Sequence, residues 1–370
     1  MRRWLPILLF CLLCPAVSCF ALALCDYRSP LTDLSDLVLG FSYQYFNDPF
    51  GVEDRDLNEG RLKIDYVRIY DTPQFGLDVS LSNDMSISVL SVSTYETVAD
   101  GSYKRYFSPT TDYFAFAGGS ARSSSSFESL GLYVNLGVGN GRFTDVTPLA
   151  RATRIDDYLV EHGSLSDHLH PVDLQILADE IGSYATYESP AELLAEVQEI
   201  IEDSGRVKTG GLDALDISEI TRLIEEDGFS RYCGWDAKIG LGYELLDASG
   251  GEKDLLVTGA FNYAFTTTPD IQFLVQGSFS GPPAILETNR IDATVAYDCL
   301  VSDLLSLSLA YGFSRETWAR VPTDIHTVTV DFALRPLSTA NVVLSLVFES
   351  RPYYTEWNVD IRLSVGMKLL

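Results

Sequence analysis

Three of the four histidines lie close together in the chain, and imidazoles are the first side chains to examine for chemistry. His162, His168 and His170 occur within one short stretch, with Asp167 beside them. Two imidazoles separated by one residue can share a transition metal, and a carboxylate can add an oxygen ligand. The stretch is typical of a solvated loop between two helices, so the sequence identifies no metal ligand and no cofactor.

The other candidates for catalysis stand alone. His326 follows Asp324 closely, but no GxSxG sequence accompanies them, so a hydrolase triad is not supported. The glycine-rich run at residues 137–141 precedes Arg142 rather than a helix, and it therefore lacks the setting of a phosphate-binding loop. The sequence names no catalytic residue, and we expect a protein without enzymatic activity.

The first 23 residues are expected to be an export signal. A basic pair and an apolar run precede an A-x-A cleavage site at residues 21–23. An uncleaved membrane anchor is one alternative, but Pro15 within the apolar run favours a signal peptide. A lipoprotein signal ending at Cys19 is a second alternative, because residues 16–19 loosely resemble a lipobox.

Cysteine placement follows from that assignment. Four of the six cysteines lie in or beside the signal segment: Cys11, Cys14, Cys19 and Cys25. Only Cys233 and Cys299 remain, without CxxC spacing, which excludes a thiolate zinc site. A disulfide between them is open to an exported protein. Both fall on outward strand positions, so we interpret them as small hydrophobic residues facing the membrane.

Composition excludes some classes of function and favours strands. The chain has 52 acidic and 26 basic side chains, a formal net charge of −26, which argues against electrostatic binding of nucleic acid. Hydrophobic residues make up 46% of the 370 residues, and 20 Tyr and 19 Phe stand against 3 Met. Aromatic residues are enriched in β-strands.

Most of the chain alternates with period two. In residues 232–246 apolar side chains occupy one face, and glycines and charged side chains the other. Residues 130–139 and 357–370 repeat the pattern. Weaker or similar segments occur at residues 36–46, 61–70, 74–88, 98–107, 112–121, 255–265, 271–280, 290–299, 304–314, 326–335 and 340–349. The total is about fourteen strands, and any even number from twelve to sixteen fits. Residues 74–88 predict either one long strand or a hairpin.

A soluble β-sandwich also has alternating strands, but these segments are long for one. They span about 10–14 residues, whereas soluble strands usually have five or six. Their polar faces carry charged residues, and aromatic residues gather near the segment ends, as in interfacial girdles. A closed barrel is the one β architecture that leaves no unpaired backbone in lipid. We therefore predict an antiparallel, all-β transmembrane barrel.

The chain resembles bacterial outer-membrane β-barrel proteins of the porin-like kind over the signal segment and most of residues 36–142 and 231–370. The strand at residues 357–370 is similar to the C-terminal signal that such proteins present to the barrel-insertion machinery, although it ends in Leu369-Leu370 rather than an aromatic residue. The resemblance implies a place in the outer-membrane lipid of a bacterium. It also implies short turns on the periplasmic side and longer loops outside, including residues 315–325.

Residues 147–230 interrupt the alternation with a 3.6-residue period. Four capped amphipathic helices are predicted there, beginning near Thr147, Pro171, Ser189 and Asp216. This inserted all-α subdomain carries 19 acidic and 5 basic residues. The predicted division of the chain is residues 1–23, 24–146, 147–230 and 231–370. By strand counting the insert lies on the periplasmic side, where it could cap the pore, plug the lumen, dock a periplasmic partner or simply be solvated.

The alternation also predicts which charged side chains face the lumen. They are Arg61, Lys63, Asp65, Asp236, Lys238, Glu244, Arg290, Asp292, Asp298, Asp360, Arg362 and Lys368. Such residues tune selectivity in a channel or close a small lumen by pairing. The leading hypothesis is a passive channel or transporter lined or gated by the insert. The alternative is a structural protein whose acidic insert docks a partner, and a membrane-embedded enzyme ranks third.

Overall fold

The computed structural model describes most of the chain. The described residues are 24–28, 31–46, 57–88, 91–208, 210–226, 229–248, 254–284, 287–302, 304–337, 340–352 and 357–368. The predicted signal segment, with Cys11, Cys14 and Cys19, and the terminal Leu369-Leu370 lie outside them. Within the described residues, no helix is both long and apolar enough to cross a bilayer.

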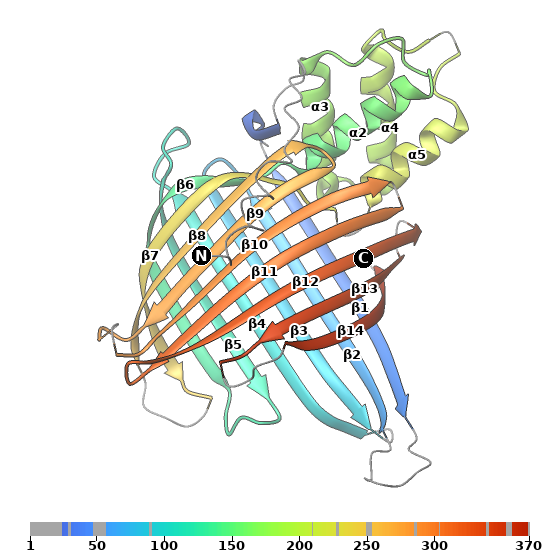
Figure 1. Ribbon diagram of the computed structural model, residues 1–370. Helices are drawn as coiled ribbons and strands as arrows, with labels where there is room; N and C mark the ends of the chain where they lie inside the picture. The colour runs from blue at the N-terminus through green and yellow to red at the C-terminus, as the bar shows by residue number, and fades with distance from the viewer. Residues whose placement is uncertain are drawn as a thin grey trace, which may run out of the picture.

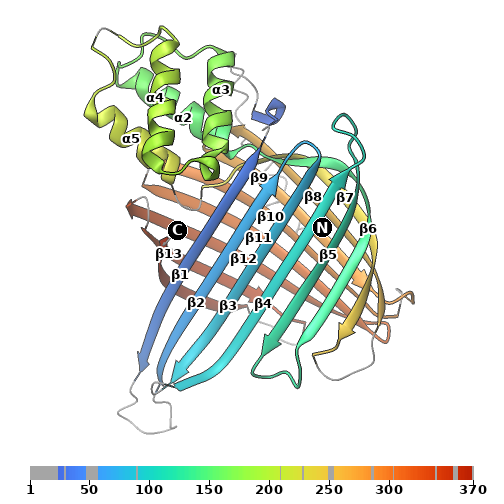
Figure 2. The same cartoon turned by 180° about the vertical axis from the view of Figure 1, so that it is seen from behind.

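Fourteen strands form one closed antiparallel barrel, in which sequence neighbours pair (Figures 1 and 2). They are β1 (Thr32–Phe46), β2 (Leu57–Asp71), β3 (Phe75–Ser88), β4 (Ser91–Tyr106), β5 (Tyr113–Ser124), β6 (Gly131–Asp145), β7 (Tyr232–Leu246), β8 (Leu255–Thr268), β9 (Ile271–Gly281), β10 (Asn289–Ser302), β11 (Leu305–Trp318), β12 (Val321–Leu337), β13 (Ala340–Ser350) and β14 (Asn358–Lys368). The predicted fold class and the count of fourteen are confirmed.

Pairing of the first strand with the last closes the barrel. Residues 38–41 of β1 lie opposite residues 365–368 of β14, which also pairs with β13 along its length. The segment that the sequence left open, residues 74–88, is one continuous strand in register with β2 and β4. Every strand therefore has two neighbours, as lipid requires of a sheet.

Connections differ in length between the two ends of the barrel. At the end that carries the helices, residues 72–74 join β2 to β3 and residues 269–270 join β8 to β9. At the other end, residues 247–254 and 282–288 form longer connections. These connections fit the predicted short turns beside the insert and longer loops opposite it, but residues 107–112 at the helical end are longer than that prediction expects.

One predicted outer loop is wrong. Residues 315–325 were expected to be a loop, but β11 and β12 continue through them and are joined by Ala319 and Arg320 alone. Both residues have positive φ, 48° and 68°. Two consecutive left-handed residues match the twist of a two-residue hairpin, although glycine or asparagine is the usual choice there. Because the turn contains neither glycine nor asparagine, the sequence gave no signal for it.

The interruption between β6 and β7 is a helical lobe of residues 147–230. Its helices are α2 (Thr147–Glu161), α3 (Pro171–Gly182), α4 (Pro190–Asp203) and α5 (Ala214–Glu225), with the single turn η2 (Tyr184–Thr186). All of them gather beyond one end of the barrel (Figures 1 and 2). Their apolar stripes bury a common core that includes Leu149, Ile155, Leu177, Val197 and Ile220. The four predicted helices are thus present.

Local chemistry sets where the helices begin. Proline lies in the first turn of α2, α3 and α4, where its missing N–H costs nothing. Ser189 caps α4 by accepting a hydrogen bond from the backbone N–H of Glu192. The cap of α5 is Asp213 rather than the predicted Asp216, and these two aspartates form a reciprocal capping box.

Buried contacts fix the helical lobe to the barrel rim. The backbone N–H of Arg231 donates to Thr147 Oγ1 (2.8 Å), and its guanidinium donates to the carbonyls of the β8–β9 turn. The same guanidinium lies 4.4 Å from the ring centre of Phe229, and that of Arg154 lies 4.8 Å from it. Arg154 also pairs with buried Glu226. The lobe is therefore docked on the rim rather than tethered by a flexible linker.

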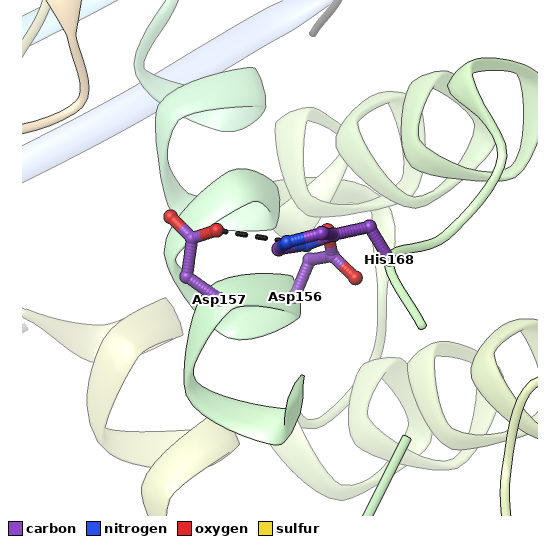
Figure 3. A group of neighbouring side chains, drawn as sticks. All are labelled: Asp156, Asp157 and His168. Carbon is purple, nitrogen blue, oxygen red and sulfur yellow. Dashed lines mark hydrogen bonds and ion pairs between the residues drawn. The ribbon is translucent and has the colours of Figure 1, made fainter. Parts of the chain in front are cut away.

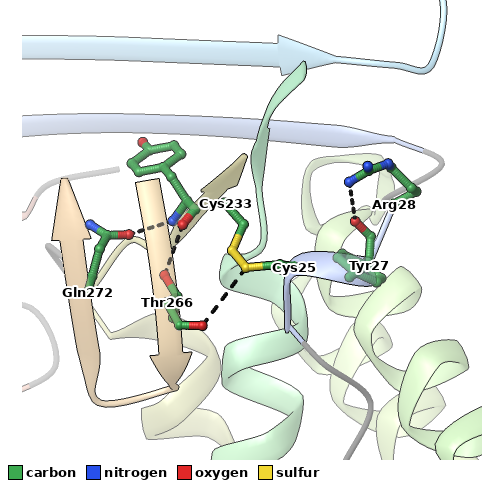
Figure 4. Close-up of a disulfide and its surroundings, with 7 residues drawn as sticks. Cys25, Tyr27, Arg28, Cys233, Thr266 and Gln272 are labelled. Carbon is green, nitrogen blue, oxygen red and sulfur yellow. Dashed lines mark hydrogen bonds between the residues drawn. A yellow bond between two sulfur atoms is a disulfide. The ribbon is translucent and has the colours of Figure 1, made fainter. Parts of the chain in front are cut away.

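A disulfide joins the first described segment, residues 24–28, to the barrel. Cys25, in the single turn η1 (Leu24–Asp26), is bonded to Cys233 at the start of β7 (Figure 4). The interpretation of Cys233 as a membrane-facing residue is wrong. Although its parity is outward, η1 folds over the rim and leaves Cys233 1% exposed. Cys299 is a free thiol.

Residues 24–28, here called the N-terminal strap, lie at the helix-bearing end of the barrel. They contact β7 and β8 through η1. Tyr27 Oη donates a hydrogen bond to Asp179 of α3 (2.9 Å), and the Tyr27 side chain is 1% exposed. The strap therefore packs between the rim of the barrel and the helical lobe.

The disulfide predicts a covalent and a thermodynamic signature. Proteolysis of the unreduced protein should give one peptide that links Cys25 to Cys233, detected by mass spectrometry. The bond closes a loop over a sequence separation of 208 residues. Cys233→Ser should therefore lower the free energy of unfolding by about 2–4 kcal/mol. Cys299→Ser is the matched control and should change it little; equal losses would contradict the assignment.

Candidate functional site: the lumen and its helical end

Apolar side chains cover the outer surface of the barrel. In β7, Ile239 is 62% exposed and Leu241 51% exposed, and Leu363 in β14 is 66% exposed. Exposed residues of the same kind recur on β6, β8 and β11. A continuous apolar band around a sheet without edges has one suitable solvent, the hydrocarbon of a bilayer. The protein is a transmembrane β-barrel.

His326 lies among aromatic residues on that outer face. Its ring accepts or donates a hydrogen bond with the hydroxyl of Tyr311 (2.8 Å) and lies 5.3 Å from Phe313. The neighbouring Asp324 pairs instead with Arg315 (2.7 Å). The barrel therefore uses His326 in an aromatic girdle, and the structure forms no His–Asp catalytic pair from these residues.

Comparisons with known proteins give only loose structural matches. No protein-family model and no curated protein matches the chain. Among solved structures, Omp33 of Acinetobacter baumannii is 8% identical and aligns over 92% of this chain and 100% of its own, with a TM-score of 0.37. A BenF-like porin from Pseudomonas fluorescens and OpdK from Pseudomonas aeruginosa are each 10% identical over 92% of this chain and 98% of theirs, with TM-scores of 0.36 and 0.34. These superpositions are loose. The assignment of a barrel therefore rests on the strand pairing and the apolar outer face of this chain itself.

The charged residues predicted for the lumen alternate with that outer face, and several form ion pairs along the wall. Four of these contacts join the predicted residues to near neighbours: Arg61 to Asp84 (3.2 Å), Lys63 to Asp65 (2.8 Å), Arg290 to Asp292 (2.8 Å) and Arg362 Nε to Asp360 (2.6 Å). Serine hydroxyls donate to Asp65 and Asp292 (both 2.7 Å). Asp298 lies in register with Gln272 and Ser308, and the side chain of Lys368 lies outside the described residues. Ion pairs between close neighbours leave the centre of the lumen open.

Two hollows lie within the barrel. The wider one, about 920 Å³, brings together the predicted Lys238, Glu244, Arg290 and Asp292. The narrower one, about 380 Å³, is lined by Asp236 and Lys238. The hollows are also lined by charged residues that the sequence analysis did not name. They are Asp78, Asp100 and Arg122 in the wider hollow, and Asp71, Asp78, Lys104 and Asp145 in the narrower one. Their inward parity is the signal that was available.

Aromatic rings narrow the passage between the hollows. Phe114 and Phe116 of β5 point inward and are almost fully buried. They lie across the glycines of β6, so a Cβ on Gly139 would come within 2.3 Å of the Phe114 ring. The Lys238 ammonium lies 5.3 Å from the ring centre of Phe116. The glycine-rich run of residues 137–141 therefore makes room for lumen aromatics, a role that its sequence alone did not show.

The clustered histidines of the helical lobe do not converge. His162 stacks on Tyr158, and His170 contacts Arg206 through Nε2 (3.0 Å). His168 alone faces carboxylates, those of Asp156 and Asp157 (Figure 3). The hydrogen bond to Asp156 raises the pKa of His168, and burial raises the pKa of Asp156.

The two faces of β14 give a direct test of the membrane assignment. Leu363 lies mid-strand on the outer face, where an arginine near the bilayer midplane costs about 2–4 kcal/mol. Leu363→Arg should therefore lower the refolded yield, measured as the fraction that migrates faster unboiled than boiled in detergent gels. Ser364→Arg places the same charge on the lumen face and should be tolerated better. Equal losses, or the reverse order, would contradict the assignment.

Proposed function

We propose that the protein is a passive channel for small solutes, restricted at the end that carries the helical lobe. The observation that carries this proposal is the continuity of the lumen. The two hollows share Asp78, Phe116 and Lys238 in their linings, so they are adjacent, and we infer that they form one passage. Among the described residues of the helical lobe, none lines either hollow, which disfavours a plug.

The position of the lobe supports restriction at the mouth. The lobe connects β6 to β7. Its elements α3 and η2 contact β1, which lies six strands away around the ring. The N-terminal strap packs at the same end and donates a hydrogen bond to α3 through Tyr27. A solute that leaves the lumen at this end has to pass around both elements.

Charge at this mouth supports a preference for cations. The helical lobe has 19 acidic against 5 basic residues. Inside the barrel, the narrower hollow adds Asp71, Asp78, Asp145 and Asp236 against Lys104 and Lys238. A concentrated negative potential raises the local concentration of cations and lowers that of anions.

The ring of Phe116 offers a test of the passage itself. Phe116→Ala removes a side chain that is 7% exposed where the two hollows meet, so single-channel conductance in a planar bilayer should rise. Phe261→Ala is the matched control, because Phe261 is an outward residue of β8 that is 41% exposed. If the wild-type protein shows no conductance steps, the proposed channel is wrong. If Phe116→Ala and Phe261→Ala have equal conductance, Phe116 does not line the passage.

Replacement of residues 147–230 by a short Gly/Ser linker tests the restriction. The barrel should still fold, because each strand keeps its hydrogen-bonded neighbours. Conductance should rise, and the reversal potential in a salt gradient should show a weaker cation preference, since most of the acidic charge at the mouth is gone. An unchanged reversal potential and conductance would exclude the lobe from the permeation path.

A docking role for the helical lobe is the second candidate. On α3, Val172 is 68% exposed and Ile176, one turn later, 45% exposed, beside acidic residues. Apolar anchors within a negative surface suit a basic periplasmic protein. For this candidate, Val172→Asp would abolish co-purification of such a partner while conductance stays unchanged, and retained co-purification would contradict it.

A further inference from the structure

Three ligand-bearing side chains converge in the helical lobe (Figure 3). Asp156 and Asp157 are consecutive residues of α2, and His168 lies in the connection to α3. His168 Nδ1 is 2.8 Å from Asp156 Oδ2 and 3.7 Å from Asp157 Oδ1, and donor atoms from all three lie within 4.8 Å of one another. Ligands around a tetrahedral ion with bonds of about 2.0–2.2 Å are roughly 3.3–3.6 Å apart. Small side-chain shifts would therefore suffice to surround a metal.

The backbone already orients two of these side chains. Asp156 is 4% exposed, and its Oδ1 accepts a hydrogen bond from the backbone N–H of Leu169 (2.9 Å), which leaves Oδ2 for the cluster. The backbone N–H of His168 donates to Asp167 Oδ1 (2.9 Å). Contacts of this outer-shell kind orient the ligands of metal sites and strengthen their binding.

The charges around the cluster favour a cation. Within the described residues, neither Asp156 nor Asp157 forms an ion pair with Lys or Arg, so His168 is their one basic neighbour. Asp167 and, from the β8–β9 turn of the barrel, Asp270 add negative potential at the two carboxylates. A buried carboxylate without a full counter-charge is costly, and a divalent ion would remove that cost.

We propose that Asp156, Asp157 and His168 bind a divalent transition metal, with Zn²⁺ the best match, and that water fills the remaining position. One imidazole nitrogen and two carboxylate oxygens are ligands that Zn²⁺ accepts, whereas Ca²⁺ and Mg²⁺ take oxygen ligands alone. The ion would link α2 to the α2–α3 connection and offset the repulsion between α2 and Asp270. It would thereby stiffen the lobe where it meets the barrel.

The test uses the full-length, untagged protein in detergent, stripped with EDTA and titrated with Zn²⁺ in a calorimeter. We expect one Zn²⁺ per chain. His168→Ala and Asp157→Asn should each weaken binding by more than about tenfold, since even changes to outer-shell partners cost 10–100-fold. His162→Ala and Asp173→Asn are the matched controls, because each removes the same chemical group from elsewhere in the lobe. Both should keep wild-type affinity.

Other outcomes would overturn the site. They are no Zn²⁺ binding by the wild type, equal weakening in Asp173→Asn, or displacement of Zn²⁺ by equimolar Ca²⁺ or Mg²⁺, which would indicate a diffuse acidic surface. Unboiled and boiled gel mobility confirms that each variant is folded. Substitution with Co²⁺ gives a second readout, because a tetrahedral site with one imidazole produces visible absorption that His168→Ala should abolish. None of these measurements depends on conductance, so the site and the proposed channel stand or fall separately.

Discussion

Backbone hydrogen bonding is the constraint on which the rest of this molecule depends. In hydrocarbon an unpaired N–H or C=O costs several kcal/mol, so a sheet is stable there only when its first strand meets its last. Here residues 38–41 of β1 and 365–368 of β14 form that seam. Closure then dictates the side chains, because the pleat alternates them between lipid and lumen. The apolar exterior and the charged interior are two consequences of one ladder.

The periodicity of the sequence carries most of this architecture. Two-residue alternation marked the strands, and parity predicted that charged side chains such as Arg61, Asp236 and Arg290 face the lumen. The alternation within one strand does not predict how side chains of neighbouring strands pack against each other. The aromatic contacts of Phe114 with Gly139 depend on the register between β5 and β6, which no single segment contains. The turn at Ala319 and Arg320 was missed for a local reason, since neither residue type is usual at positive φ.

Long-range pairing explains the error at Cys233. Parity correctly placed it outward, yet the N-terminal strap returns from the other end of the sequence to cover it. Such a contact has no local signature: in the sequence, Cys25 lies beside a predicted cleavage site and 208 residues before its partner. The same holds for Asp156 and His168, which are twelve residues apart and meet only because α2 ends and the chain reverses before α3. In both cases tertiary structure, rather than sequence spacing, creates the chemistry.

The disulfide between Cys25 and Cys233 also changes the covalent connectivity of the chain. It converts β1 to β6 and the helical lobe into a single ring of chain, while β7 to β14 remain a linear tail. Outer connections such as residues 125–130 belong to the ring. A protease that cuts one of them opens the ring but releases no fragment, because both new ends stay attached through the sulfur bridge. A cut at residues 247–254, in the tail, separates the chain into two pieces held together by hydrogen bonds alone. Surface damage at two neighbouring loops therefore has different chemical outcomes.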